Sequence, residues 1–278
     1  MKNSRKNIEV WKFLIGIGVG AGLMLLILYA SLFSSGMPFG NKIAIINIRG
    51  VISSSPDLLT ETFTLQEAFS LFKRVEDDQS IKGVLLIIDS PGGSVVASRE
   101  IAYALREIKK PKVCWLGDIA ASGAYWIASS CDRIVADPLT ITGSIGVSAS
   151  YLEFSKLFEK YGVTYEQITS GERKDIGSPF RNLTEEEREK LQYMTNEIFT
   201  YFLNDIKERR NLIKWQIDKI SSGDIFLGKD AVSLGLVDSL GTLSDAKEIA
   251  KKLVGLNNIE FIEIEKKGIS LFDLLRMG

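Results

Sequence analysis

Short apolar runs rich in β-branched residues alternate with stretches of helical periodicity along most of the 278-residue chain. The apolar runs cover residues 43–48, 84–89, 113–116, 133–136 and 259–264. The helical stretches between them cover residues 64–76, 95–109, 121–130 and 155–161. Strands that alternate with helices of about 10–15 residues are typical of βαβ units, whose strands are parallel. The pattern therefore predicts an α/β domain built on a parallel sheet.

A helical extension is expected after this alternation. Thr184 and Glu187 form the S/T-x-x-E pattern of a capping box, which opens a helix. Apolar residues then recur every three or four positions as far as about Arg210, and these are Leu191, Met194, Ile198, Phe202 and Ile206. Shorter helices are expected near residues 214–221, 229–234 and 243–253, with glycines at 235, 241 and 255 as stops.

The segment from Phe13 to Phe33 contains 21 residues and no charge. A helix of this length crosses a hydrocarbon core about 30 Å thick, whereas a cleavable signal peptide has an apolar core of about 7–15 residues and a small-residue cleavage site. The segment is therefore predicted to be an uncleaved transmembrane anchor. Four lysines and arginines precede it and only Lys42 and Arg49 lie close after it, so we expect a cytoplasmic N-terminus and an extracytoplasmic main domain.

The chain contains no histidine, which excludes a Ser-His-Asp triad, a Cys-His dyad and a histidine metal site. Its two cysteines, Cys114 and Cys131, are too few for a disulfide framework or a four-ligand zinc site. Their small or apolar neighbours favour buried thiols, and a single bridge between them stays open. The 34 basic and 35 acidic residues give a net charge of −1, so nothing indicates a nucleic-acid partner.

Two small-residue turns follow predicted strands and precede predicted helices. In the first turn, the N–H groups of Gly92 and Gly93 lie beside a helix N-terminus and can bind an anion or an oxyanion, or the turn is merely tight. In the second turn, Ser122 would expose its hydroxyl and Gly123 would offer an N–H to an oxyanion. The alternative for Ser122 is a simple helix N-cap.

Two further segments contain polar residues that could serve a site. Ser144 lies in a third small-residue turn, 140–147, which could equally be a packed loop. Lys174 lies in a polar loop, 170–179, ahead of the long helix, where a lysine is ordinarily solvated surface.

Taken together and in this order, the four segments resemble the short-form, protease IV-like serine signal peptide peptidases of prokaryotic membranes. The matching stretches read DSPGGSV, AASGAYWIAS, DPLTITGSIGV and SGERKDIGSPFR, and the likeness extends over about residues 42–255. The resemblance implies the βαβ spiral of the Clp protease/crotonase superfamily, here with a helical extension and a preceding transmembrane helix. Ala124 and Trp126 stand where glycine and tyrosine are frequent in this family.

The resemblance also implies the roles of individual residues. Ser122 matches the nucleophile, Lys174 matches the general base, and Ser144 matches a serine that orients this lysine. Gly93 and Gly123 match the residues whose N–H groups form the oxyanion hole. A lysine base must be neutral, so Lys174 would have to lie in a closed and largely apolar site.

The family further implies endoproteolysis of cleaved signal peptides and similar apolar peptides at the cell membrane, by a homo-oligomeric ring that needs no cofactor or metal. The expected organisation is a cytoplasmic N-terminus (1–12), an anchor (13–33), a linker (34–41), a peptidase domain (42–255), and a C-terminal strand with an apolar tail (256–278). The residues leave open the ring size, the cleavage preference, the role of the tail, and whether the Ser-Lys dyad forms within or between protomers.

Three alternative functions compete with this hypothesis. The crotonase fold also supports acyl-CoA chemistry, which gives no reason for a membrane anchor. A stomatin-associated membrane protease would use the same Ser-Lys dyad on other substrates. A membrane-anchored scaffold would keep the fold without catalysis, and the presence of Ser122, Lys174 and Ser144 together argues against it.

Overall fold

The computed structural model describes residues 18, 20–27, 40–57 and 59–265. The chain divides into two units, Met1–Asn41 and Lys42–Gly278. In the first unit residues 20–27 are helical, and most of the predicted anchor, 13–33, lies outside the described residues. Over the ranges given above, no helix combines the length and hydropathy that a bilayer span requires.

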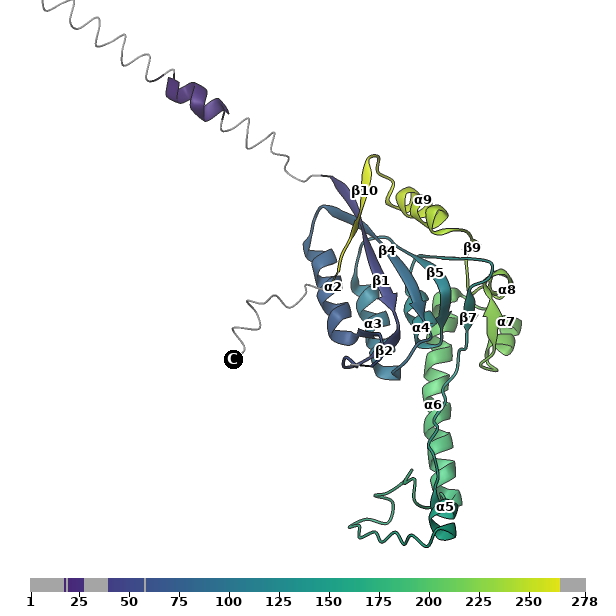
Figure 1. The fold of residues 1–278 in the computed structure, drawn as a ribbon. Coiled ribbons are helices and arrows are strands. Elements are labelled where there is room, and N and C mark those ends of the chain that lie inside the picture. The colour runs from purple at the N-terminus through teal and green to yellow at the C-terminus, as the bar shows by residue number, and fades with distance from the viewer. Residues whose placement is uncertain (1–17, 19, 28–39, 58, 266–278) are drawn as a thin grey trace, which may run out of the picture. The chain divides into compact units, whose positions relative to one another are not determined.

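The second unit is built on a mostly parallel sheet, as the alternating pattern predicts (Figure 1). Its central strands follow the order β10-β1-β4-β5-β6-β9, and their bounds are β1 Asn41–Arg49, β4 Ile81–Ser90, β5 Lys112–Ala121, β6 Arg133–Ala136, β9 Ser239–Leu240 and β10 Ile259–Glu263. Near the end of β5 the sheet is extended by β7 (Ile141–Gly143), which pairs with β5 in parallel and with β8 (Ile225–Leu227) antiparallel. A separate parallel pair is formed by β2 (Val51–Ser53) and β3 (Thr62–Thr64).

Helices cover both faces of the sheet, because successive residues of a strand point to opposite faces. The larger core contains Ala44, Ile46 and Ile48 of β1 packed with α2 (Leu65–Asp77), α3 (Val95–Glu107) and α4 (Gly123–Ala128). The smaller core, on the other face, contains Ile43 of β1 and Leu85 of β4 packed with α9 (Leu243–Val254). The prediction of an α/β fold is confirmed.

A helical extension follows β7. It comprises α5 (Ser155–Lys160), a loop and the long helix α6 (Glu185–Arg210), and it continues into α7 (Lys214–Ile220) and α8 (Gly228–Ser233). The capping box predicted for Thr184 and Glu187 is present in both directions at the start of α6. Phe202 and Ile206 of α6 are buried in the larger core, whereas Met194 is 48% exposed.

The first part of α6 therefore extends beyond the sheet and its covering helices. Figure 1 shows α5 and the loop at the far end of α6. We call residues 155–194 the arm. At 1.5 Å per residue, the helix between Glu187 and Phe202 is about 22 Å long.

Candidate active site

Ser122 occupies the turn between β5 and α4 in a backbone conformation that an L-residue rarely adopts. Its φ is 53° and its ψ is −124°, and its N–H donates to the carbonyl of Gly143 at 2.9 Å. Such strain costs about 1–3 kcal/mol and persists only where the surrounding structure enforces it. Ser122 is partly exposed between the buried residues Ala121 and Gly123. The turn thus presents a hydroxyl at the carboxyl end of a central strand.

Ser144 lies beside Ser122 because β7 pairs with β5. Ala121 is opposite Gly143 in this parallel register, so the next residue of each strand leaves the sheet at the same edge. Ser144 also has a positive φ, 48°, and its N–H donates to the carbonyl of Asp224 at 2.8 Å. The structure therefore brings together two of the predicted site residues that are far apart in sequence.

The glycine turn after β4 packs directly against the Ser122 turn. A Cβ placed on Gly92 would lie 2.7 Å from the nitrogen of Gly123 and 3.0 Å from the Cβ of Ser122. Gly92 also has a φ of 97°. Only glycine satisfies both demands, because it has no Cβ and tolerates a positive φ. The sequence motif contains Gly92, but its packing role could not be read from the motif alone.

The backbone nitrogens of Gly93 and Gly123 lie close together at this contact. The bridge between Ile52 and Gly93 uses the carbonyl of Gly92 and the N–H of Ser94, at 2.9 and 2.8 Å, and leaves the N–H of Gly93 outside the pairing. Gly123 is the first residue of α4, where N–H groups have no partner within the helix. A Cβ on Gly123 would lie 3.5 Å from the nitrogen of Gly93. Two backbone donors beside a serine hydroxyl can stabilise a developing oxyanion.

Lys174 lies at the far end of the arm and not beside Ser122 of the same chain. Its side chain is exposed, and its backbone N–H closes a turn to the carbonyl of Gly171 at 3.0 Å. The neighbouring Asp175 is paired with Arg181, which also pairs with Glu187 at the start of α6. Within the described residues, no carboxylate is paired with the Lys174 ammonium. The structure thus brings together Ser122, Ser144, Gly93 and Gly123, but leaves the lysine apart.

An apolar cavity of about 390 Å³ begins one helical turn from Ser122. The N–H of Trp126 donates to the carbonyl of Ser122 at 3.0 Å, and its ring stacks on Phe202 at 4.3 Å between centroids. The cavity is lined by Val95, Arg99, Trp126, Glu197, Ile198 and Tyr201. Sequence reasoning noted Trp126 as unusual but did not find this cavity, since α6 meets α3 and α4 only in the folded chain.

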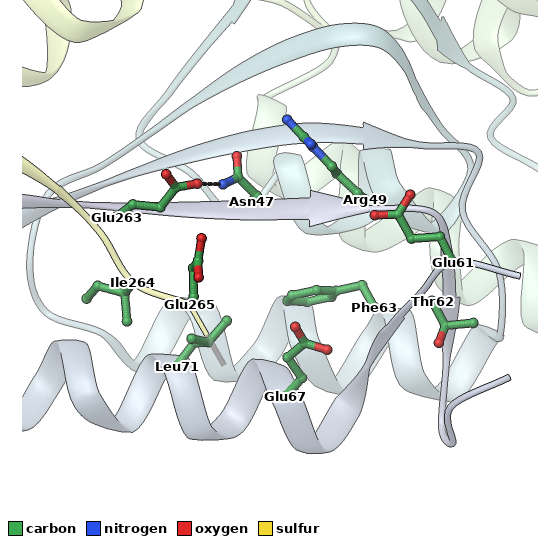
Figure 2. Close-up of a pocket in the computed structure, with 10 residues that line it drawn as sticks. All are labelled: Asn47, Arg49, Glu61, Thr62, Phe63, Glu67, Leu71, Glu263, Ile264 and Glu265. Carbon is green, nitrogen blue, oxygen red and sulfur yellow. Dashed lines mark hydrogen bonds between the residues drawn. The ribbon is translucent and has the colours of Figure 1, made fainter. Parts of the chain in front are cut away.

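A second cavity, of about 360 Å³, is polar and lies beside β1, α2 and the end of β10 (Figure 2). It contains the carboxylates of Glu61, Glu67, Glu263 and Glu265 together with Arg49. None of the predicted site residues lines it. This cavity is therefore separate from the candidate active site.

The remaining candidate groups are buried in the core. Cys114 and Cys131 are free thiols, and burial raises the pKa of Cys114 well above its ordinary value. Tyr125 is fully buried, its hydroxyl donates to the carbonyl of Leu236 at 2.8 Å, and burial raises its pKa too. Among the residues whose positions are given, no group of three or more acidic or thiol side chains is placed to hold a metal ion.

Comparison with known proteins gives two family matches. The model described as Peptidase family S49 matches residues 104–257, and that described as Clp protease matches residues 60–135. A relative from Methanocaldococcus jannaschii, provisionally named a protease, is 42% identical over 72% of this chain. A relative from Enterococcus faecium, provisionally named a signal peptide peptidase, is 36% identical over 80% of it. Protease 4 of Haemophilus influenzae is 36% identical over 77% of it.

The matched regions cover 66% of the first two relatives and 35% of the third. Among solved structures, a membrane-bound stomatin-specific protease in complex with a substrate peptide superposes with a TM-score of 0.53 at 15% identity. This alignment covers 85% of the present chain and 96% of the protease chain. At this identity the likeness concerns the fold alone.

Proposed function

Because the chain belongs to peptidase family S49, we propose that it is a serine endopeptidase in which Ser122 is the nucleophile and Lys174 the general base. The observation that carries this proposal is the strained turn of Ser122, packed against a glycine turn so that the backbone nitrogens of Gly93 and Gly123 lie close together next to it. Backbone strain that the surrounding structure enforces on a serine, next to the backbone N–H groups of two glycines, is typical of a functional site and not of a purely structural turn.

In the proposed mechanism, neutral Lys174 takes the proton of the Ser122 hydroxyl, which attacks the scissile carbonyl. The N–H groups of Gly93 and Gly123 bind the oxyanion that forms. The Lys174 ammonium then protonates the leaving amine, and water deacylates the enzyme. Ser144, beside Ser122 on the neighbouring strand, orients the lysine through a hydrogen bond. A lysine is neutral only where water is largely excluded, so the reaction requires the site to be closed around its amine.

We further propose that this closure comes from a neighbouring protomer in a homo-oligomer. Within one chain, the loop that carries Lys174 is joined to Glu187 at the start of α6. About 22 Å of helix separates Glu187 from Phe202, which stacks on Trp126 near Ser122. The arm also exposes large apolar side chains, at Leu157, Tyr161, Val163, Tyr165, Ile168, Tyr193 and Met194. Exposed apolar surface of this kind marks an interaction site. A second copy would cover it and receive Lys174 beside its own Ser122.

The proposed substrates are apolar peptides, with cleaved signal peptides as the physiological class. The cavity next to Trp126 supports this choice, because Val95, Ile198 and Tyr201 offer apolar surface to a substrate side chain. We also propose that residues 13–33 anchor the protein, with the N-terminus in the cytoplasm and the peptidase domain outside. An enzyme so placed meets peptides at the membrane surface.

The proposal is tested with the full chain in detergent and a fluorogenic apolar peptide. Ser122→Ala and Lys174→Met should each lower kcat by about 10³-fold or more, since both groups act in the same step. Lys207→Met, on the exposed surface of α6 outside the arm, is the matched control and should retain wild-type activity. Activity that survives Lys174→Met would show that another group is the base, and activity that survives in both variants would remove the dyad altogether.

A further inference from the structure

The guanidinium group of Arg181 joins the loop that carries Lys174 to the start of α6. Nε and Nη2 of Arg181 donate to the two carboxylate oxygens of Asp175 at 2.6 and 2.8 Å. Nη1 and Nη2 of the same residue donate to the two oxygens of Glu187 at 2.8 and 2.6 Å. Both contacts are bidentate, which fixes direction as well as distance.

Burial separates this cluster from an ordinary surface ion pair. The side chains of Asp175 and Glu187 are 12% and 3% exposed, and that of Arg181 is 32% exposed. Glu187 also accepts from the N–H of Thr184 at 2.9 Å, so the cluster is continuous with the capping box of α6. Arg173 of the same loop pairs with Glu186 of α6, but these side chains are 60% and 73% exposed. Of these two connections between the loop and the helix, the Arg181 cluster is the more buried and the one with bidentate contacts.

We infer that Arg181 is a positioning residue for Lys174. It fixes the position and direction of the lysine relative to the start of α6. The inference rests on the proposed function, because it assumes that Lys174 is the base. Lys174 directly precedes Asp175, and its turn is closed by hydrogen bonds from Lys174 to Gly171 and from Ser178 to Asp175 at 3.0 and 2.8 Å. A base delivered to a distant serine at the end of a long helix needs such a support, since small displacements of a reacting group cost much of the rate.

The charge of Arg181 acts in the same sense as its geometry, because it offsets the Asp175 carboxylate, which would otherwise favour the charged form of Lys174. The hydrogen bonds from Arg181 hold the pKa of Asp175 below its usual range, so the carboxylate beside Lys174 is ionised whenever the base is active. The charged residues of α5, of the loop 161–184 and of the first turn of α6 are Lys156, Glu159, Lys160, Glu166, Glu172, Arg173, Lys174, Asp175, Arg181, Glu185, Glu186 and Glu187. Among them, Arg181 alone contacts both the lysine loop and the buried carboxylate of α6.

The test compares Arg181→Gln, Arg181→Lys and Arg173→Gln in the full chain, with Lys174→Met as the reference for a lost base. Arg181→Gln should lower kcat by about 10- to 100-fold with little change in KM. It should also move the acidic limb of the pH profile to higher pH, because a loosely held ammonium stays hydrated and gives up its proton less readily. Arg181→Lys keeps the charge but not the fork, so it should recover only part of the rate. Arg173→Gln, which removes the more exposed ion pair to α6, should lower kcat less than Arg181→Gln does.

The readings of this experiment separate the inference from the proposed function. If Lys174→Met is inactive while Arg181→Gln keeps the wild-type kcat and pH profile, Arg181 does not position the base and the inference fails alone. A fall in activity that only follows the amount of assembled protein, with an unmoved acidic limb, would likewise reduce Arg181 to a structural role. Activity in Lys174→Met would overturn the inference together with the proposed function.

Discussion

Gly123 is surrounded so closely that no other residue fits without displacing the turn. A Cβ at this position would lie 2.2 Å from the Oγ and 2.8 Å from the Cβ of Ser98, which is fully buried on α3. The Ser98 hydroxyl has no hydrogen-bond partner among the residues that the structure describes. Ser98 therefore packs against the Cα of Gly123, and the contact is steric rather than polar.

Gly123→Ala should accordingly destabilise the protein by about 1–3 kcal/mol, as overpacking of a core does. It should also lower kcat by about 10- to 100-fold, because the N–H proposed to bind the oxyanion moves. Urea unfolding and peptide hydrolysis measure the two effects.

The double variant Gly123→Ala with Ser98→Gly removes both clashing atoms and is the control. It should recover most of the lost stability, since the new methyl group then occupies the vacated space. If Gly123→Ala alone is as stable and active as wild type, the packing described here does not constrain the turn.

At the scale of elements, the end of the arm depends on carboxylates that stay ionised. Hydrogen bonds from Arg181, and then from the N–H of Thr184, lower the pKa of Glu187 from an ordinary 4.5 to about 2. A carboxyl whose pKa is lower in the folded state stabilises that state above its unfolded pKa and loses the effect as pH falls through its folded pKa. The link between the lysine loop and α6 should therefore be constant above about pH 5.

Between pH 4.5 and about 2, the arm should open before the sheet unfolds. Pepsin is active in this range, and cleavage within the loop 161–184 should increase as the pH falls. Glu187→Gln cannot ionise, so its loop should be cleaved rapidly at every pH in the series. Equal protection of the loop in the two proteins would show that the Glu187 pairing contributes nothing to the arm.

The same elements show what the sequence could and could not predict. The sequence predicts the central strands β1, β4 and β5 from the mostly apolar, β-branched runs 43–48, 84–89 and 113–116, which are typical of strands buried on both faces. At β7 the sequence predicts only a small-residue turn, since these three residues become a strand through pairing with β5 and not through a pattern of their own. The periodicity of α6 predicted one apolar face, but Met194 on that face is exposed because the helix leaves the domain there.

For the site, the order of the four motifs pointed to Ser122, Ser144, Gly93 and Gly123 together, and the β5–β7 register and the glycine contact place them side by side. The cavity beside Trp126 depends on α6 crossing α3 and α4, and such a crossing has no local signal in the sequence. The roles of these residues stay predictions until they are measured.

At the scale of the whole molecule, one chain brings together every proposed part of the site except the base, Lys174, which lies at the end of the arm. The exposed apolar residues of the arm and the exposed Lys174 at its end are both explained if each arm reaches the Ser122 turn of the next copy. Head-to-tail contacts form a ring when the rotation between copies closes, and each proposed site would then take its serine from one protomer and its lysine from another.

Mixing two inactive variants tests this arrangement directly. Ser122→Ala keeps Lys174, and Lys174→Met keeps Ser122, so a site between two different variants is complete. If equal amounts are dissociated, mixed and reassembled at random, about a quarter of the sites in a head-to-tail ring should be active. A doubly substituted chain mixed with Ser122→Ala is the control and should give no activity, because no Ser122 is present. If the mixture of single variants also stays inactive, although both variants are shown to share oligomers, the dyad forms within one chain and the arm must fold back to its own Ser122.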